Sequence, residues 1–117
     1  MKAIVKSMWV DSPTIELDSY VPDNAENFSL WIEVRVGPDD SVGVDDYRVL
    51  VCTPEWLRQN VWEPQWGRHM LIVRGYDRAA IETCVRDYIA GCTGDEWGVV
   101  AKKIARNLSW EFEDYQN

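Results

Sequence analysis

The segment FSLWIEVRVG, residues 28–37, limits the possible fold of this chain most narrowly, because its apolar and polar side chains alternate. Successive side chains of a β-strand point to opposite faces, so this alternation predicts a strand with one buried and one solvent-facing side. The second side carries Trp31, Glu33 and Arg35. The buried side is aliphatic and consists of Leu30, Ile32, Val34 and Val36. A sheet with one apolar face needs a second layer to cover it.

The residues that follow predict a β-hairpin and then a helix. GPDDSVG, residues 37–43, has the composition of a turn, and YRVLVC, residues 47–52, returns as the second strand. Thr53 can cap the exposed amides of a helix, and Pro54 suits its first position, where an N–H is not needed. We therefore expect a short helix over residues 54–61.

Two longer helices are predicted in the C-terminal half. Asp77 is placed to begin a helix over residues 78–92, and its apolar stripe has helical spacing. That stripe is Ile81, Cys84, Val85, Tyr88, Ile89 and Cys92. Thr93 with Glu96 matches a capping box, which predicts a second helix over residues 95–106.

Three further strands complete the pattern. Residues 2–10 and 108–115 read as strands, and the apolar run RHMLIVRG, residues 68–75, predicts a central strand covered on both faces. Residues 11–27 contain two prolines and predict a long acidic loop with one short helical turn. We expect one α+β domain over residues 1–117, with a mostly antiparallel sheet of about five strands and three helices packed on one face.

The negative charge is concentrated in one part of the chain. The net charge is −8, and residues 11–46 hold ten acidic residues and one basic residue, Arg35, which gives −9. Such a field repels nucleic acid and membrane phosphates and attracts basic proteins. An acidic surface that serves only solubility is the alternative. We expect no nucleic-acid partner and no membrane partner.

A search for reactive groups predicts no catalytic residue, no metal site and no cofactor. His69 is the single histidine and falls in the predicted strand 68–75, without partners at catalytic or ligand spacing. Cys52 precedes a helix start, which would stabilise a thiolate, but a buried strand-end cysteine explains it better. Glu111 and Glu113 alternate along a strand, which favours a solvent-facing position over an acid–base pair.

The cysteines and the hydropathy indicate a cytoplasmic protein. Cys52, Cys84 and Cys92 form no Cys-x-x-Cys pair, and three separated thiols suggest small buried residues in a reducing compartment. No apolar run approaches the roughly 20 residues that a membrane helix needs.

Tryptophan is abundant, with seven in 117 residues, and three of them are candidates for partner contacts. Trp31 lies on the polar face of its strand, and Trp62 and Trp66 lie in the predicted loop WEPQWG. Exposed tryptophan beside charged side chains is typical of an interaction hot spot. Packing of each tryptophan against a neighbouring loop or helix is the alternative.

Four stretches of the chain are distinctive together: DSPTIELDSYVPDNAENF, GPDD followed by DDYRVLVCTPEWL, GRHMLIVRGYD, and WEFEDY. In this order and spacing they resemble the immunity protein 8 family of bacterial polymorphic toxin systems. The resemblance covers nearly the whole chain and implies an α+β fold without enzymatic activity. It also implies an antidote that binds and neutralises a cognate toxin. Asp39-Asp40-Ser41 departs from the lysine or further glycine that family members tend to have in the first hairpin loop.

The resemblance and the charge together suggest an acidic contact surface for a basic toxin, for which a nuclease is one candidate. Its candidate carboxylates are Asp39, Asp40, Asp45, Asp46, Asp18 and Asp23, and its candidate anchors are Trp31, Trp62 and Trp66. An adaptor or subunit that binds another basic protein is the alternative function. An enzyme would need a cleft that holds Cys52 or His69 beside a carboxylate. Exposed strand edges would permit a homodimer.

Overall fold

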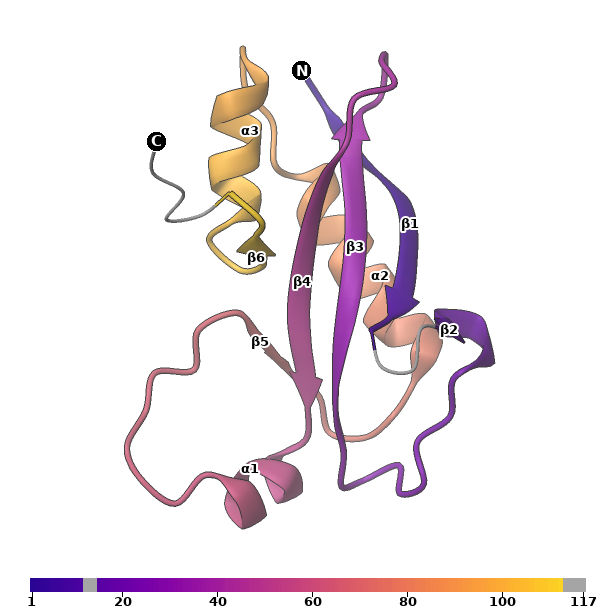
Figure 1. The fold of residues 1–117 in the computed structure, drawn as a ribbon, viewed down its shortest axis with the longest axis vertical. Coiled ribbons are helices and arrows are strands. Elements are labelled where there is room, and N and C mark those ends of the chain that lie inside the picture. Colours follow the sequence, from indigo (N-terminus) through magenta and orange to yellow (C-terminus); the bar gives the residue numbers. More distant parts are fainter. Residues whose placement is uncertain (12–14, 113–117) are drawn as a thin grey trace.

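The computed structural model describes residues 1–11 and 15–112, and a long β-hairpin forms its centre (Figure 1). Strand β3, Ser29–Pro38, pairs antiparallel with β4, Asp45–Cys52. Opposite Ile32 stands Val49, and opposite Glu33 stands Arg48, so the predicted alternation continues across both strands. The predicted hairpin is confirmed.

The remaining strands extend the sheet on both sides of the hairpin. The order is β2-β1-β3-β4-β5, in which β1 is Ala3–Val10, β2 is Ile15–Glu16 and β5 is Met70–Ile72. Strand β6, Ser109–Trp110, also pairs with β4, beside Tyr47 and Arg48, whereas β5 pairs with its opposite end. The β4–β5 pairing is parallel and the other pairings are antiparallel.

A bulge in β1 keeps its apolar side chains on one face of the sheet. Val5 pairs with Val36 and Ser7 pairs with Arg35, so Lys6 is an extra residue in the ladder. Because the extra residue shifts the alternation by one position, the apolar side chains before and after it point the same way. They are Ala3, Val5, Met8 and Val10.

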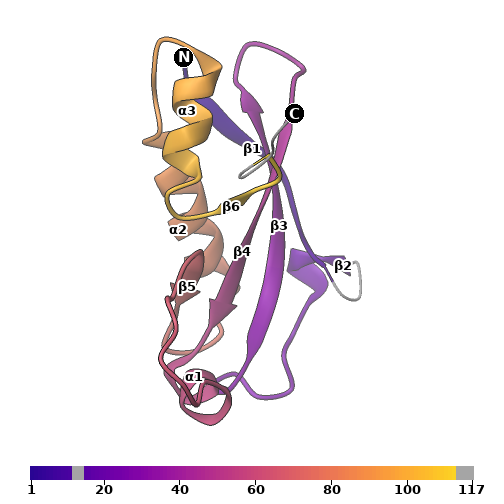
Figure 2. The same ribbon diagram turned by 60° about the vertical axis from the view of Figure 1, so that its left-hand side comes forward.

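Two helices cover the aliphatic face of the sheet and leave the other face open (Figure 2). They are α2, Arg78–Ala90, and α3, Trp97–Ile104. Helix α2 buries Ile81, Val85 and Ile89 against the sheet. The predicted α+β fold with a mostly antiparallel sheet is confirmed. Helix α1, Pro54–Asn60, differs from the expectation because it lies at the end of the sheet (Figure 1).

Two of the three predicted helix starts are confirmed. The Thr53 side chain accepts a hydrogen bond from the Trp56 amide, and Asp77 accepts one from the Ala80 amide. The prediction of a capping box at Thr93 and Glu96 is wrong, since α3 begins at Trp97 and the Glu96 side chain makes no capping hydrogen bond.

The central strand predicted over residues 68–75 is also wrong. Strand β5 has three residues, lies at the edge of the sheet, and leaves Ile72 56% exposed. His69 lies in the turn before β5 with φ 61°, a left-handed conformation, so the strand does not extend back to residue 68. The run is apolar on both sides for another reason: Met70 and Ile72 line a groove beside α1, and Leu71 packs on the core.

Three smaller expectations are settled by the same structure. The predicted helical turn in the acidic loop is present as a 3₁₀ helix, Leu17–Ser19. Cys84 is exposed, which corrects its place on the buried stripe of α2, whereas Cys52 and Cys92 are buried. The last strand is shorter than residues 108–115, and Glu113 lies outside the described residues.

Candidate partner-binding surfaces

The predicted contact residues lie in different parts of the molecule and form no single surface. The tip of the β3–β4 hairpin, with Asp39 and Asp40, lies at one end of the long axis, and the loop between α1 and β5 lies toward the other end (Figure 1). The molecule extends 42 Å along this axis. One small contact therefore cannot include both the hairpin aspartates and the tryptophans of residues 61–69.

The hairpin tip is exposed and held in place by its base. Asp39 and Asp40 both lie at the surface. Gly37 allows the loop to fold back closely, because a Cβ there would lie 2.1 Å from the Gly43 carbonyl oxygen. Lys6 Nζ donates a hydrogen bond of 2.7 Å to the Ser41 carbonyl oxygen. The tip thus presents two carboxylates on a braced turn.

Asp45 and Asp46 follow in the same hairpin but have internal roles. They are adjacent residues of a strand and point to opposite faces. Trp97 Nε1 donates a hydrogen bond of 2.7 Å to Asp45, which ties α3 to the sheet. Asp46 accepts two hydrogen bonds from the Arg35 guanidinium, at 2.8 and 3.1 Å. The four hairpin aspartates therefore do not act as one charged cluster.

Asp18 and Asp23 are exposed on the segment between β2 and β3. Tyr76 holds this segment against the body of the protein. Its hydroxyl donates to the Tyr20 carbonyl oxygen at 3.0 Å, and its amide donates to the Ala25 carbonyl oxygen at 2.7 Å. The two aspartates thus belong to an anchored acidic edge beside β2.

Trp62 and Trp66 project from the loop between α1 and β5, and they are 85% and 92% exposed. Beside the loop is an open groove of about 510 Å³ with an apolar lining. Leu57, Val61 and Ile72 contribute side chains to it. Large exposed apolar side chains beside a groove mark an interaction surface more clearly than scattered ones do.

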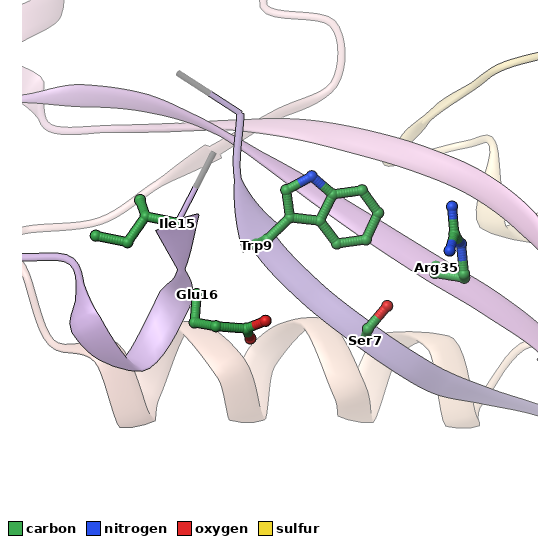
Figure 3. A pocket seen from close by; sticks show the side chains of 5 residues that line it. All are labelled: Ser7, Trp9, Ile15, Glu16 and Arg35. Atoms are coloured by element: carbon green, nitrogen blue, oxygen red, sulfur yellow. The ribbon is translucent and has the colours of Figure 1, made fainter. Parts of the chain in front are cut away.

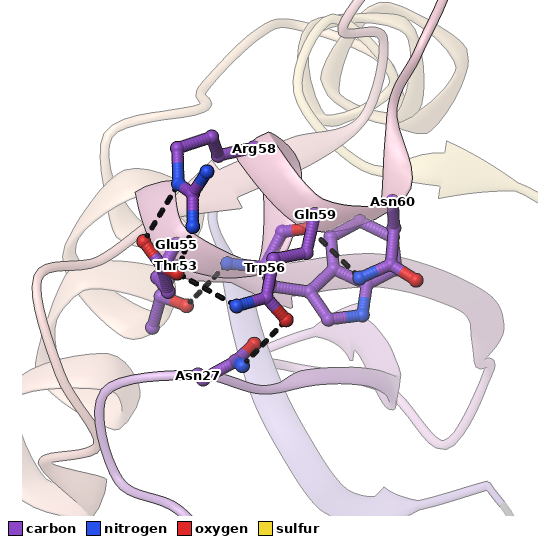
Figure 4. Close-up of polar contacts among 7 residues, drawn as sticks. All are labelled: Asn27, Thr53, Glu55, Trp56, Arg58, Gln59 and Asn60. Carbon is purple, nitrogen blue, oxygen red and sulfur yellow. Dashed lines mark hydrogen bonds and ion pairs between the residues drawn. The ribbon is translucent and has the colours of Figure 1, made fainter.

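A hydrogen-bond network fixes the helix from which this loop departs (Figure 4). Glu55 accepts hydrogen bonds from Arg58 and Gln59, each at 2.7 Å at its shortest. Asn27 donates to the Gln59 side chain at 3.0 Å and so joins α1 to the segment before β3. The loop that carries Trp62 and Trp66 therefore starts from a helix that is fixed by hydrogen bonds.

The sheet face opposite the helices carries a fourth group of side chains, in which arginines lie over tryptophans. The Arg48 guanidinium lies 3.9 Å from the centre of the Trp31 ring, and that of Arg35 lies 5.3 Å from the centre of the Trp9 ring. Stacking of this kind shields the indoles without a second layer of structure. Trp31 lies on the polar face, as predicted, and is half-buried.

Sequence reasoning did not select Trp9 or Arg48 for this face. Arg48 could have been found, because it precedes Val49 in the alternating second strand. Trp9 could not be placed on a face, because the bulge at Lys6 reverses the alternation within β1.

A pocket of about 400 Å³ opens on this face between β1 and β2 (Figure 3). The Trp9 ring lies at its centre, with Glu16 on one side and Arg35 on the other (Figure 3). Glu33 stands beside Trp9 in the ladder. Burial and the negative charge of Asp11 raise the pKa of Glu33, although the charge of Arg48 opposes the shift.

Cys52 and His69, the two groups considered for catalysis, both lie in contact with the protein's own core or backbone. Burial raises the pKa of the Cys52 thiol, which makes it a weaker nucleophile at neutral pH. His69 Nε2 lies 3.1 Å from the Ala105 carbonyl oxygen. Within residues 1–11 and 15–112, no three His, Cys, Asp or Glu side chains form a group that could hold a metal ion. No helix of the described chain is long and apolar enough to span a membrane.

A family model described as immunity protein 8, Imm8, matches residues 3–115. The chain belongs to this family. Membership in immunity protein 8 supports an immunity role within a toxin system, and immunity proteins are generally inhibitors without catalytic activity. No curated protein and no solved structure matches the chain.

Proposed function

We propose that this chain binds a cognate protein toxin and neutralises it by forming a complex, without catalysing a reaction. The match to immunity protein 8 over residues 3–115 is the observation that carries this proposal. Since the toxin must be countered inside the cell that makes it, we place the complex in the cytoplasm. The free thiols of Cys52, Cys84 and Cys92 agree with a reducing compartment.

The toxin that we propose has a basic surface, as a nuclease does. The net charge of −8 favours such a partner, and the excess of acids in residues 11–46 concentrates the field on one part of the chain. Asp39, Asp40, Asp18 and Asp23 are exposed and contribute to this field. Steering acts over roughly a Debye length of 8 Å at physiological salt, so these carboxylates accelerate encounter even where they make no contact.

The first experiment is co-expression with the neighbouring open reading frame. We expect the neighbour to stop growth when expressed alone, and this chain to restore growth and to co-purify with it. A harmless neighbour, or a toxic one that this chain neither binds nor counteracts, would contradict the proposal. The alternative of an adaptor for another basic protein would then account for the acidic surface.

A second experiment separates steering from contact. Asp39 and Asp40 are changed together to lysine, because reversal of Asp45 or Asp46 would also break the contacts to Trp97 and Arg35. The expected result is an association rate reduced by about tenfold at low salt and a weaker dependence on salt. An unchanged rate and salt dependence would show that the hairpin does not steer the partner.

The exposed loop provides the proposed apolar anchor. Trp62→Ala and Trp66→Ala should raise the Kd for the toxin by tenfold or more if either ring is a hot spot, since truncation of one costs about 2 kcal/mol or more.

The exposed edges of β2 and β5 would permit a homodimer. Light scattering at two salt concentrations would detect one.

A further inference from the structure

One face of the sheet has no covering layer in the described part of the chain. Helices α2 and α3 both lie on the opposite side (Figure 2). We use the term open face for the uncovered side chains of β1, β2, β3 and β4. Its central members are Trp9, Glu16, Trp31, Glu33, Arg35 and Arg48. An exposed sheet face that carries two tryptophans offers a flat, rigid area for a protein partner.

The positive charges of the open face are already engaged within it. Arg35 makes two hydrogen bonds to Asp46 and lies over Trp9. Arg48 stacks on Trp31. These contacts hold both guanidinium groups in place.

Around Glu33, near the middle of the open face, carboxylates outnumber the arginines. Glu33 lies between Trp9 and Arg48 in the ladder, and the negative charges of Asp11, Asp46 and Glu111 all act on it in one direction. The pKa of Glu33 is raised in spite of Arg48, with burial as the first cause. A further cation at this position would relieve the repulsion among these carboxylates.

The pocket beside Trp9 has the groups that recognise a long cationic side chain. The Glu16 carboxylate lies on one side of the indole, and the cavity of about 400 Å³ is open to solvent (Figure 3). An arginine stacks its flat head on an aromatic ring and pairs its N–H groups with a carboxylate, and a lysine can make a similar contact as a point charge. Arg35 lines the far side of the pocket, and repulsion between like charges favours a second cation near Glu16.

We propose that the open face docks a basic segment of the partner protein, with one arginine or lysine side chain placed between Trp9 and Glu16. Charge complementarity selects this occupant over two others. A second copy of the chain would bring an equal charge of −8 against this one. Nucleic acid would bring phosphates to a face with excess carboxylate. The proposal rests on the proposed function only for the identity of the partner as a toxin.

The test that does not depend on the toxin is an NMR titration with a nona-arginine peptide. We expect the indole N–H signals of Trp9 and Trp31 to shift, with those of Trp62 and Trp66 unchanged. Shifts confined to Trp62 and Trp66, or to the amides of Asp39 and Asp40, would overturn the assignment of the face.

Matched variants make the titration quantitative. Glu16→Gln with Glu33→Gln removes two charges from the open face, and Asp87→Asn with Asp95→Asn removes two from exposed positions in the helical part of the chain. The first pair should weaken peptide binding by about tenfold and the second by less than about twofold. Equal losses in the two pairs would overturn the proposal, because they would reflect net charge alone. Circular dichroism would confirm that both proteins remain folded.

The toxin itself separates failure of the surface from failure of the function. If the native chain neutralises the toxin and Glu16→Lys with Glu33→Lys does not, the open face is the docking surface. If this charge-reversed variant neutralises as well as the native chain, the face is overturned and the function stands. If the native chain fails to neutralise, the proposed function is overturned, and the peptide titration still decides whether the face binds basic segments.

Discussion

The two faces of the sheet are built from the same strands but stabilised in different ways. The covered face presents Ile32, Val34 and Val36, which are all completely buried beneath the helices. The open face presents Trp31 and Trp9, which arginines on neighbouring strands partly cover. The comparison shows that tryptophan on a sheet does not by itself indicate a core position. Partial burial on the open face leaves room for a partner, whereas the covered face is complete.

The largest expected effect tests the covered face. Ile32→Ala removes a fully buried side chain and should lower the free energy of unfolding by about 2–5 kcal/mol. Urea denaturation would measure it, with Glu33→Ala on the adjacent, open side as the control at about 1 kcal/mol or less. Equal losses in the two variants would mean that the two faces do not differ in burial.

The next effect compares an aspartate at the base of the hairpin with one at its tip. Asp45→Ala leaves Trp97 Nε1 without its acceptor and should cost about 1–3 kcal/mol of stability. Asp40→Ala removes an exposed carboxylate of the same hairpin and should change stability by no more than about 0.5 kcal/mol. Thermal unfolding would compare them, and a similar change in both would remove the distinction between the tip and the base.

A smaller effect measures the stacked pairs of the open face. A double-mutant cycle with Trp31→Leu and Arg48→Gln should give a coupling of about 0.5–1 kcal/mol, because the cation lies 3.9 Å from the ring centre. The corresponding cycle for Trp9 and Arg35 should give less, since that distance is 5.3 Å. The reverse order would show that distance to the ring does not control the stacking.

The smallest effect depends on pH and concerns Glu33. Its raised pKa means that the folded state binds this proton more tightly than the unfolded state, so stability falls as pH rises between the two pKa values. Glu33→Gln should therefore be slightly more stable than the native chain at pH 7, by less than about 1 kcal/mol because solvent screens the site. The gain should shrink below about pH 4, where glutamate is protonated in both states. A gain that is independent of pH would point to packing instead.

Local sequence signals predicted the elements whose pattern is complete within a few residues. The alternation from Leu30 to Val36 predicted the hairpin strand and its two faces, and the Thr53 and Asp77 caps marked the starts of α1 and α2. The exposed loop with Trp62 and Trp66 was also predicted, because its turn-forming residues break both the helical and the strand periodicity of the sequence.

Features that depend on distant partners were not predicted. The run 68–75 is as apolar as a central strand, but the left-handed backbone at His69 and the groove beside α1 leave β5 at the edge. Asp45 and Asp46 point to opposite faces because side chains alternate along β4. A predicted strand that extended back from residue 47 to residue 45 would have shown this. The contact residues belong to separate elements, so their distances apart depend on the path of the whole chain.

The sequence by itself determined the β3–β4 hairpin, the aliphatic face of β3 and the starts of α1 and α2, because these depend on side-chain periodicity and on capping within one turn. It also determined the acidic charge and the resemblance to immunity protein 8. Only the tertiary structure decided that the Trp9 ring lies between Glu16 and Arg35, because a bulge and two strand pairings, β1 with β2 and β1 with β3, bring them together. The pocket is a property of the assembled sheet, since no single segment contains its three partners.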